Sequence, residues 1–294
     1  MTYHFAMIFI HDFRTLHNVS TQLLCDTFNA AFSDYIVPLH LTPSILEQKM
    51  QGENLQRDYS IGAFADNDLG GFILHATDNK IHPAILYNGG TGVTPTYRGQ
   101  HLVQKMYDKF IPVYQQQGIR KIILEVISTN LPAIKAYTNS GFHKTRIIHS
   151  FKGVVDIHKA AANISIKENT APDWLPLSTF MDMTPTWSNT VDSIQREGAF
   201  TTTWEAMING ETAGYISVHK DTRRIRNIAV APRFRRQGIG TALLQHAAEE
   251  LQGGPMSIIN IDEHFPEIGQ FLKKAGLDHY LSQFEMENDL AFSH

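Results

Sequence analysis

A short segment in the second half of the chain combines arginine and glycine in a pattern that suits anion binding. It reads Arg235-Arg236-Gln237-Gly238-Ile239-Gly240 and follows a β-rich run that ends in Val230-Ala231-Pro232. Backbone N–H groups at the start of a helix have no partners within the helix, and the helix dipole adds positive potential there. Glycine lacks the Cβ that would keep a bulky phosphate away. The segment therefore predicts a turn that grips a pyrophosphate, and the alternative is an ordinary basic strand-to-helix turn.

Much of this pattern occurs a second time, earlier in the chain. Residues 92–100 match residues 229–237 at a constant offset of 137, and Val, Pro, an aromatic residue, Arg and Gln recur in step. Residues 137–142 also match residues 272–277, at an offset of 135. A repeat of this length indicates a duplicated domain and not a short-period solenoid. We expect two domains, residues 1–158 and 159–294, with a boundary near Lys159.

Each half shows the same order of predicted elements, which is a β-meander, a helix, a strand and a second helix. Alternating or apolar runs predict the strands, and apolar residues at helical spacing before a glycine predict the helices. In the first half the strands are Tyr59–Ala65, Gly70–Thr77, Ala84–Val93 and Lys121–Ile127, with helices Gln100–Gln117 and Pro132–Ser140. In the second half the strands are Phe200–Ile208, Thr212–His219, Ile225–Val230 and Met256–Ile261, with helices Gly238–Gln252 and Pro266–Ala275.

At this junction the chain resembles the GNAT superfamily of N-acetyltransferases, whose signature is Gln/Arg-x-x-Gly-x-Gly/Ala. Arg235, Gly238 and Gly240 match that signature. The resemblance covers nearly all of the chain and implies an α/β fold (α+β, mixed sheet) of two tandem GNAT domains. It also implies a sheet that opens after its fourth strand around acetyl-CoA, the acyl donor, whose pantetheine amides pair with that strand. The implied cofactor-binding residues of the second half are Ala229, Val230, Arg235, Arg236, Gln237, Gly238, Ile239, Gly240 and Thr241.

The first half departs from the signature because His101 and Val103 stand where glycines are expected. Backbone amides and not side chains grip the phosphates, so a residue whose Cβ points away is tolerated. We therefore still expect acetyl-CoA to bind there. The implied residues are Gly92, Val93, Arg98, Gly99, Gln100, His101, Leu102 and Val103, and His101 is expected to contribute shape or a weak charge, not catalysis.

Downstream of the turn, the first half keeps a family-like pattern that contains Glu125, Asn130 and Tyr137. By resemblance, Tyr137 is the candidate general acid for the departing thiolate, and the alternative is a core aromatic residue. Asn130 is placed near the pantetheine, and the alternative is a helix N-cap. Glu125 is the candidate base for the amine if its side chain faces the cleft and not the other face of the strand. A strand amide at Val93 or Val230 is a candidate to stabilise the carbonyl oxygen.

The second half has lost two of these groups, since Phe265 and Leu272 replace Asn130 and Tyr137. The first half thus has the better acid and the second half the better phosphate turn. One active and one partly degenerate domain is a plausible outcome, but the pattern does not decide which half reacts.

The composition and charge of the chain limit the classes of ligand and partner that it can bind. The net charge of -4 and the pI near 6.4 provide no broad basic surface, which argues against nucleic acid. Cys25 is the only cysteine and lies in an apolar helical stretch, so we expect a buried thiol and a cytoplasmic protein. The absence of a long apolar run argues against export and membrane spanning. The 15 histidines are scattered, so no metal is expected.

The sequence predicts transfer of an acetyl group from acetyl-CoA to a primary amine of a small molecule or peptide. A non-catalytic acyl-CoA-binding sensor or scaffold is the alternative, and a longer acyl group or a hydroxyl acceptor stays open. Substrate-facing surfaces are expected from residues 28–46 and 174–195. Within the latter, Trp187 either lines an acceptor pocket or packs against the following helix.

Overall fold

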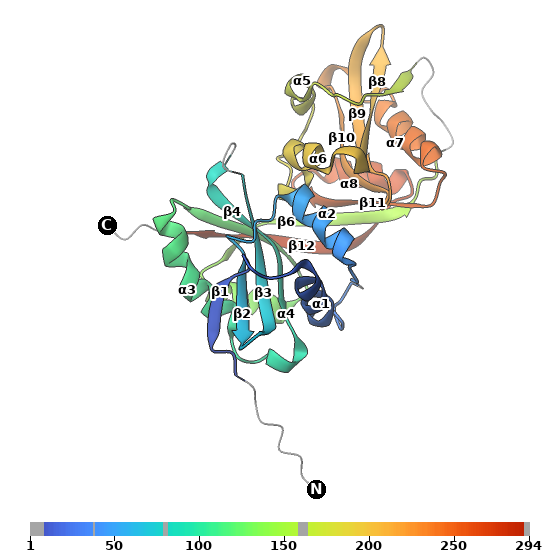
Figure 1. The fold of residues 1–294 in the computed structure, drawn as a ribbon. Coiled ribbons are helices and arrows are strands. Elements are labelled where there is room, and N and C mark those ends of the chain that lie inside the picture. The colour runs from blue at the N-terminus through green and yellow to red at the C-terminus, as the bar shows by residue number, and fades with distance from the viewer. Residues whose placement is uncertain (1–8, 38, 79–81, 158–163, 291–294) are drawn as a thin grey trace. The chain divides into compact units, whose positions relative to one another are not determined.

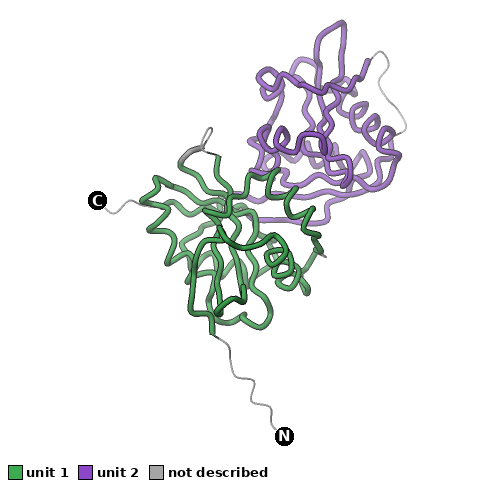
Figure 2. Tube along the Cα trace, in the orientation of Figure 1, with its two compact units in different colours: residues 1–145, 285–294 green, residues 146–284 purple. Residues whose placement is uncertain are grey.

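The computed structural model describes residues 9–37, 39–78, 82–157 and 164–290. These residues form two compact units (Figure 2). Unit 1 consists of residues 1–145 and 285–294, and unit 2 of residues 146–284. The predicted boundary near Lys159 lies outside the described residues and stays a prediction.

Unit 1 consists of a mixed sheet that is covered by helices (Figure 1). Its strand order is β1-β2-β3-β4-β5-β12, antiparallel from β1 to β4 and parallel between β4 and β5. β2 is buried along its whole length and β3 along most of it, so both faces of the sheet are covered. The strands are β1 (Asp12–Thr15), β2 (Ile61–Ala65), β3 (Asp68–Asp78), β4 (His82–Val93), β5 (Lys121–Ile127) and the end of β12 (Asp278–Asp289). The helices are α1 (Thr21–Ala31), α2 (Pro43–Glu53), α3 (Leu102–Gln116) and α4 (Leu131–Asn139), with a 3₁₀ turn η1 (Pro95–Tyr97).

Unit 2 repeats this plan with the strand order β6-β11-β10-β9-β8-β7. Its core gathers aliphatic side chains of the sheet and of the two later helices, including Ile216, Ile225, Leu243 and Leu272, each fully buried. The strands are β6 (His143–Val154), β7 (Ser165–Glu168), β8 (Thr201–Ile208), β9 (Glu211–His219), β10 (Arg224–Val230) and β11 (Pro255–Asp262). The helices are α5 (Trp174–Ser178), α6 (Val191–Glu197), α7 (Ile239–Glu250) and α8 (Pro266–Lys274), with 3₁₀ turns η2 (Trp187–Asn189), η3 (Gly198–Phe200) and η4 (Pro232–Phe234).

All twelve elements predicted in the two halves are present, most within two residues of the predicted ends. The strands β1, β6, β7 and β12 carry no prediction from the sequence. The last strands also do not follow the repeat. β6, which follows the first copy in sequence, pairs with β11 in unit 2, whereas residues 285–289 of β12 belong to unit 1. In unit 1 the N–H of Leu290 donates to the Arg120 carbonyl at 2.7 Å, and the Asn288 amide donates to the Ser140 carbonyl at 2.8 Å.

One prediction about a single residue is confirmed in the core of unit 1. Cys25 is buried in α1, and its thiol donates to the Leu41 carbonyl. The structure also places His75 of β3 in this core, fully buried, with Nδ1 3.0 Å from the Tyr59 carbonyl oxygen. Burial lowers the pKa of His75 to about 4.

Candidate functional site

The parallel strands β4 and β5 of unit 1 separate part-way along their length. Their pairing runs from Ile85 and Lys121 to Asn88 and Leu124, whereas β4 continues to Val93 and β5 to Ile127. Backbone groups of β4 beyond Asn88 therefore face an opening on the β5 side. An extended ligand that carries amide groups can pair with such an edge.

At the end of β4 the chain turns into α3 with two residues in the left-handed conformation. Gly99 has φ 78° and His101 has φ 56°, and His101 is the N-cap of α3. Both residues are exposed. Since His101 already adopts the conformation that a glycine would have, its Cβ does not prevent the predicted turn from forming. The first N–H groups of α3 are left for a ligand or water.

The equivalent turn of unit 2 has the same backbone form. Arg236 has φ 63° and Gly238 has φ 81°, and Gly238 is the N-cap of α7. The glycine has thus changed places within the pair, since it comes first in unit 1 and second in unit 2. β10 and β11 likewise pair only at Arg224 and Ile225 before they separate. Both halves therefore keep the opened strand pair and the turn beside it.

The first arginine of each turn binds the protein itself. Arg98 donates to the carbonyls of Val93 and Ala31 and makes two hydrogen bonds to the Asp34 carboxylate at 2.6 and 2.8 Å. Its role in the structure is to fasten the end of β4 to the segment after α1.

Arg235 repeats this arrangement in unit 2. It donates to the carbonyls of Val230 and Phe180 and pairs with Asp182 at 2.6 Å. The contacts made by Arg98 and Arg235 indicate that these side chains shape the turns. Binding of phosphate by the backbone amides of the turns stays a prediction.

Glu125 faces the interior of unit 1 from β5. The Tyr87 hydroxyl on β4 donates to Glu125 Oε2 at 2.6 Å. Burial raises the pKa of Glu125 to about 7, an effect that the hydrogen bond from Tyr87 opposes and the neighbouring Glu285 and Glu53 carboxylates reinforce. A carboxyl group with this pKa can accept a proton at neutral pH. The side chain thus points toward β4 and not away from the unit, and its role as a base stays a prediction.

Tyr137 comes from α4 and is 7% exposed. Burial raises the pKa of its hydroxyl to about 12, while hydrogen bonds to Thr91 and Asn88 on β4 oppose that rise. The phenol therefore keeps its proton at neutral pH and can act as a donor. Its contacts with β4 put the hydroxyl beside the stretch of strand where β4 and β5 separate.

The sequence and the fold of this chain agree with one family. The model of the Acetyltransferase (GNAT) family matches residues 21–142 and 168–262, which is more than half of the chain. The chain belongs to this family. No curated protein sequence matches it.

Solved GNAT structures share the fold at low sequence identity. The tandem GNAT protein from the clavulanic acid biosynthesis pathway is 12% identical, with a TM-score of 0.73 over 96% of this chain and 99% of that one. A GCN5-related N-acetyltransferase from Sphaerobacter thermophilus is 13% identical, with a TM-score of 0.70 over 96% of each chain. A putative acetyltransferase from Pyrococcus horikoshii is 14% identical, with a TM-score of 0.68 over 95% of this chain and 89% of that one.

Asn130 is the N-cap of α4, where its side-chain oxygen accepts from the Ala133 N–H at 3.2 Å. Burial raises the pKa of Tyr35, and a hydrogen bond with Asn130 partly opposes this rise. The asparagine therefore has a structural role that the capping alternative describes. A contact with pantetheine stays a prediction.

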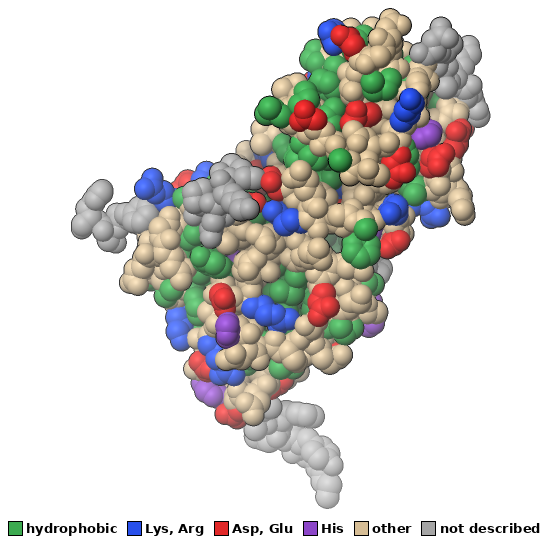
Figure 3. Space-filling model, turned by 45° about the horizontal axis from the view of Figure 1, so that its top comes forward, with side chains coloured by type: hydrophobic (Ala, Val, Ile, Leu, Met, Phe, Trp, Pro, Cys, Tyr) green, Lys and Arg blue, Asp and Glu red, His purple; other side chains and the backbone are tan. Residues whose placement is uncertain are grey.

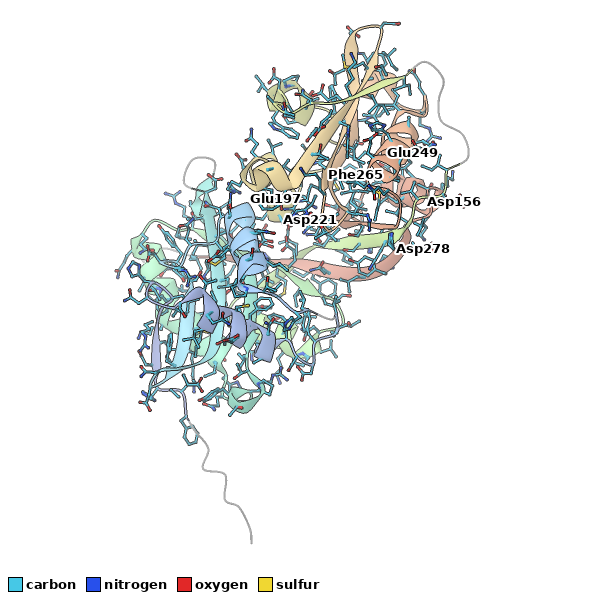
Figure 4. All side chains as sticks on the ribbon, turned by 45° about the vertical axis from the view of Figure 1, so that its right-hand side comes forward. Asp156, Glu197, Asp221, Glu249, Phe265 and Asp278 are labelled. Atoms are coloured by element: carbon cyan, nitrogen blue, oxygen red, sulfur yellow. The ribbon has the colours of Figure 1, made fainter. Side chains whose placement is uncertain are left out.

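The GNAT repeat has diverged at these same places in unit 2. Phe265 (Figure 4) is the N-cap of α8 but forms no side-chain cap. Leu272 is fully buried in the core. Tyr137, the candidate proton donor of unit 1, thus has an aliphatic counterpart in unit 2. Asn189 from η2 donates to the Ile259 carbonyl of β11 at 3.0 Å. A small cavity of about 40 Å³ remains there, lined by Arg226, Asn227 and Ile228 of β10 and by Ile258 and Ile259 of β11.

Sequence reasoning missed several polar groups of the unit 1 site. Tyr87, Asn88 and Thr91 lie on β4, and Glu53 ends α2. The three β4 residues occupy a predicted strand, so their polarity within a buried run was the available signal. Glu53 comes from a helix that no repeat marks, and only the fold brings it to β4. Trp187 is buried at 6% exposure beside α6, and a role in an acceptor pocket stays a prediction.

Two further findings concern other ligands. Within residues 9–37, 39–78, 82–157 and 164–290, no group of three or more His, Cys, Asp or Glu could hold a metal ion. Among the same residues, no helix is long and apolar enough to cross a membrane. On the face shown in Figure 3, basic and acidic side chains are interspersed.

Proposed function

We propose that the protein is an acetyl-CoA-dependent N-acetyltransferase whose unit 1 transfers an acetyl group to a primary amine of a small molecule or peptide. One observation carries this proposal. A buried carboxyl group of Glu125 and a buried phenol of Tyr137 both contact β4 where it separates from β5. An acid and a base at one opened strand pair are what acyl transfer to an amine needs.

Acetyl-CoA would supply the acetyl group, whose bond to sulfur breaks as the bond from carbon to the amine nitrogen forms. The amine arrives protonated at neutral pH, and Glu125 takes its proton because the pKa of the carboxyl group is about 7. Tyr137 holds a proton at neutral pH and gives it to the departing sulfur, and the second proton that the nitrogen loses as the amide forms restores the phenol. The N–H groups at the start of α3 would bind the pyrophosphate.

For unit 2 we propose a different role, which is binding of acyl-CoA without transfer. Its turn has the left-handed pair Arg236 and Gly238, but Leu272 lies where unit 1 has its proton donor. The single unpaired cysteine suits an intracellular reducing compartment, and the cytoplasm is the proposed place of action.

The test is a screen of primary amines with acetyl-CoA as donor and a thiol reagent to measure free CoA. We expect amine-dependent release of CoA and an acetylated product of matching mass. Bound acetyl-CoA that is never turned over with any amine would instead support the sensor alternative for the whole chain.

A further inference from the structure

The opened strand of each unit contains a bulge at the same repeat position. In unit 1, Asn88 and Gly90 pair with neighbouring residues of β3, which leaves Gly89 as the extra residue. In unit 2, Ile225 and Asn227 pair with neighbouring residues of β9, which leaves Arg226 as the extra residue. Gly89 and Arg226 are related by the repeat offset of 137 residues. At this one structural position, unit 1 thus has no side chain and unit 2 has a cationic side chain.

A glutamate also ends the helix that packs near each bulge. Glu53 is the last residue of α2 and precedes Asn54, which has φ 58°. Glu197 is the last residue of α6 and precedes Gly198, which has φ 53°. Both carboxylates therefore stand at a helix end that stops in a left-handed residue. Figure 4 shows Glu197 at the end of α6.

In unit 1 the carboxylate of Glu53 lies against the bulge. A Cβ at Gly89 would be 2.8 Å from Glu53 Oε2 and 2.7 Å from a methyl group of Leu55. Glycine is therefore what lets this carboxylate approach the β4 backbone, beside the Tyr87 ring. Glu53 is only 8% exposed, and Lys49 Nζ lies 2.7 Å from its Oε2. The carboxylate already binds one primary ammonium group.

In unit 2 the corresponding carboxylate is bound by the bulge residue itself. The Arg226 guanidinium, 4% exposed, forms an ion pair with Glu197. A pair this well buried is strongly held, because removal of either partner leaves an uncompensated charge. The carboxylate of unit 2 is thus paired with an arginine of the bulge, whereas the carboxylate of unit 1 is paired with a lysine of its own helix.

We propose that Glu53 is a specificity residue that binds the cationic amino group of the acceptor at the Gly89 bulge, and that Arg226 closes unit 2 by occupying the equivalent place. The inference rests on the proposed function and names its substrate class, which is a positively charged alkylamine. Glu53 holds the ammonium beside Glu125, which then takes the proton. Arylamines, which are neutral at pH 7.5, lack this interaction.

The first test measures direct binding and does not depend on turnover. Butylguanidine presents the cation that Arg226 supplies in unit 2, and butylurea is its neutral counterpart. Calorimetry on the full chain with acetyl-CoA present should detect binding of butylguanidine and at least ten-fold weaker binding of butylurea. Equal binding of the two compounds, or binding of neither, would overturn the inference even if amines are acetylated.

The second test uses Glu53→Gln, with Glu47→Gln on the exposed face of the same helix as the matched control. We expect Glu53→Gln to raise KM for an alkylamine ten-fold or more, with a smaller change in kcat and in KM for acetyl-CoA. KM for an arylamine should stay the same, and Glu53→Asp should recover part of the alkylamine KM. Equal KM changes for both amine types would contradict a charge-reading role. Failure of the wild-type protein to acetylate any amine would contradict the proposed function, while the calorimetry would still decide the inference.

Discussion

The hydrogen bond from Tyr87 to Glu125 offers a direct perturbation of the proposed base. It is short, at 2.6 Å, and it opposes the effect of burial on the pKa of Glu125. Hydrogen bonds to charged groups contribute about 1.5–3 kcal/mol, and one pKa unit corresponds to about 1.4 kcal/mol. Tyr87→Phe removes the donor and keeps the ring, so the pKa of Glu125 should rise by about 1–2 units above its value near 7.

The assay is the pH dependence of kcat/KM for one alkylamine. The base must be deprotonated to act, so activity falls as the pH drops through the pKa of Glu125, and Tyr87→Phe should move this limb to higher pH. Ionisation of the amine is common to both proteins, so the difference between their profiles reports on Glu125. Tyr114→Phe is the control, since the buried Tyr114 hydroxyl donates to the Tyr59 carbonyl instead. An unmoved or downward-shifted limb in Tyr87→Phe would refute the assignment of Glu125.

Two further predictions concern binding and stability. Gly238→Trp puts a large side chain on the left-handed N-cap of α7. Calorimetry of the full chain with CoA should then show no binding at unit 2. Unchanged stoichiometry and affinity would show that this turn is not part of the cofactor site. Because the pKa of Glu125 is raised from 4.5 to about 7, the folded state binds more protons than the unfolded state between these values, and stability falls as pH rises through this window. Glu125→Gln should abolish this loss, which amounts to about 3 kcal/mol, in urea unfolding at pH 4 and pH 8; a parallel loss in both proteins would show that burial of Glu125 is not its cause.

Most of the fold could be predicted because each half carries its own local signals. The run Lys121–Ile127 became β5 with the predicted bounds, and glycines at 118 and 141 follow predicted helices that end there. The exchange of β6 and the end of β12 between units could not be predicted. Two copies of one fold offer equivalent edges, and alternation along a strand does not say which edge it pairs with.

The two turns of the candidate site were expected from the repeat, and the polar groups near the first turn from the family pattern. Family spacing identified Tyr137 and Glu125, and the structure adds their contacts with β4. His101 adopts the left-handed backbone conformation that a glycine would adopt at this position. The residue type alone argues against that conformation, so the structure was needed to show that the turn is kept. Glu53 and Gly89 lie 36 residues apart in sequence, and their proximity follows from packing of α2 against the sheet. A motif that is defined by spacing along the sequence cannot predict such a contact.

Unit 1 is proposed to transfer acetyl groups and unit 2 is not, and substitution of Tyr137 separates these two roles. The measurement is the rate of acetyl transfer to an alkylamine by Tyr137→Phe and, separately, by the double variant Phe265→Asn with Leu272→Tyr. A general acid contributes roughly 10² to 10⁴ in rate, so Tyr137→Phe should lose about that factor in kcat with little change in KM, while the double variant should gain nothing. An unchanged kcat in Tyr137→Phe together with new activity in the double variant would assign catalysis to unit 2.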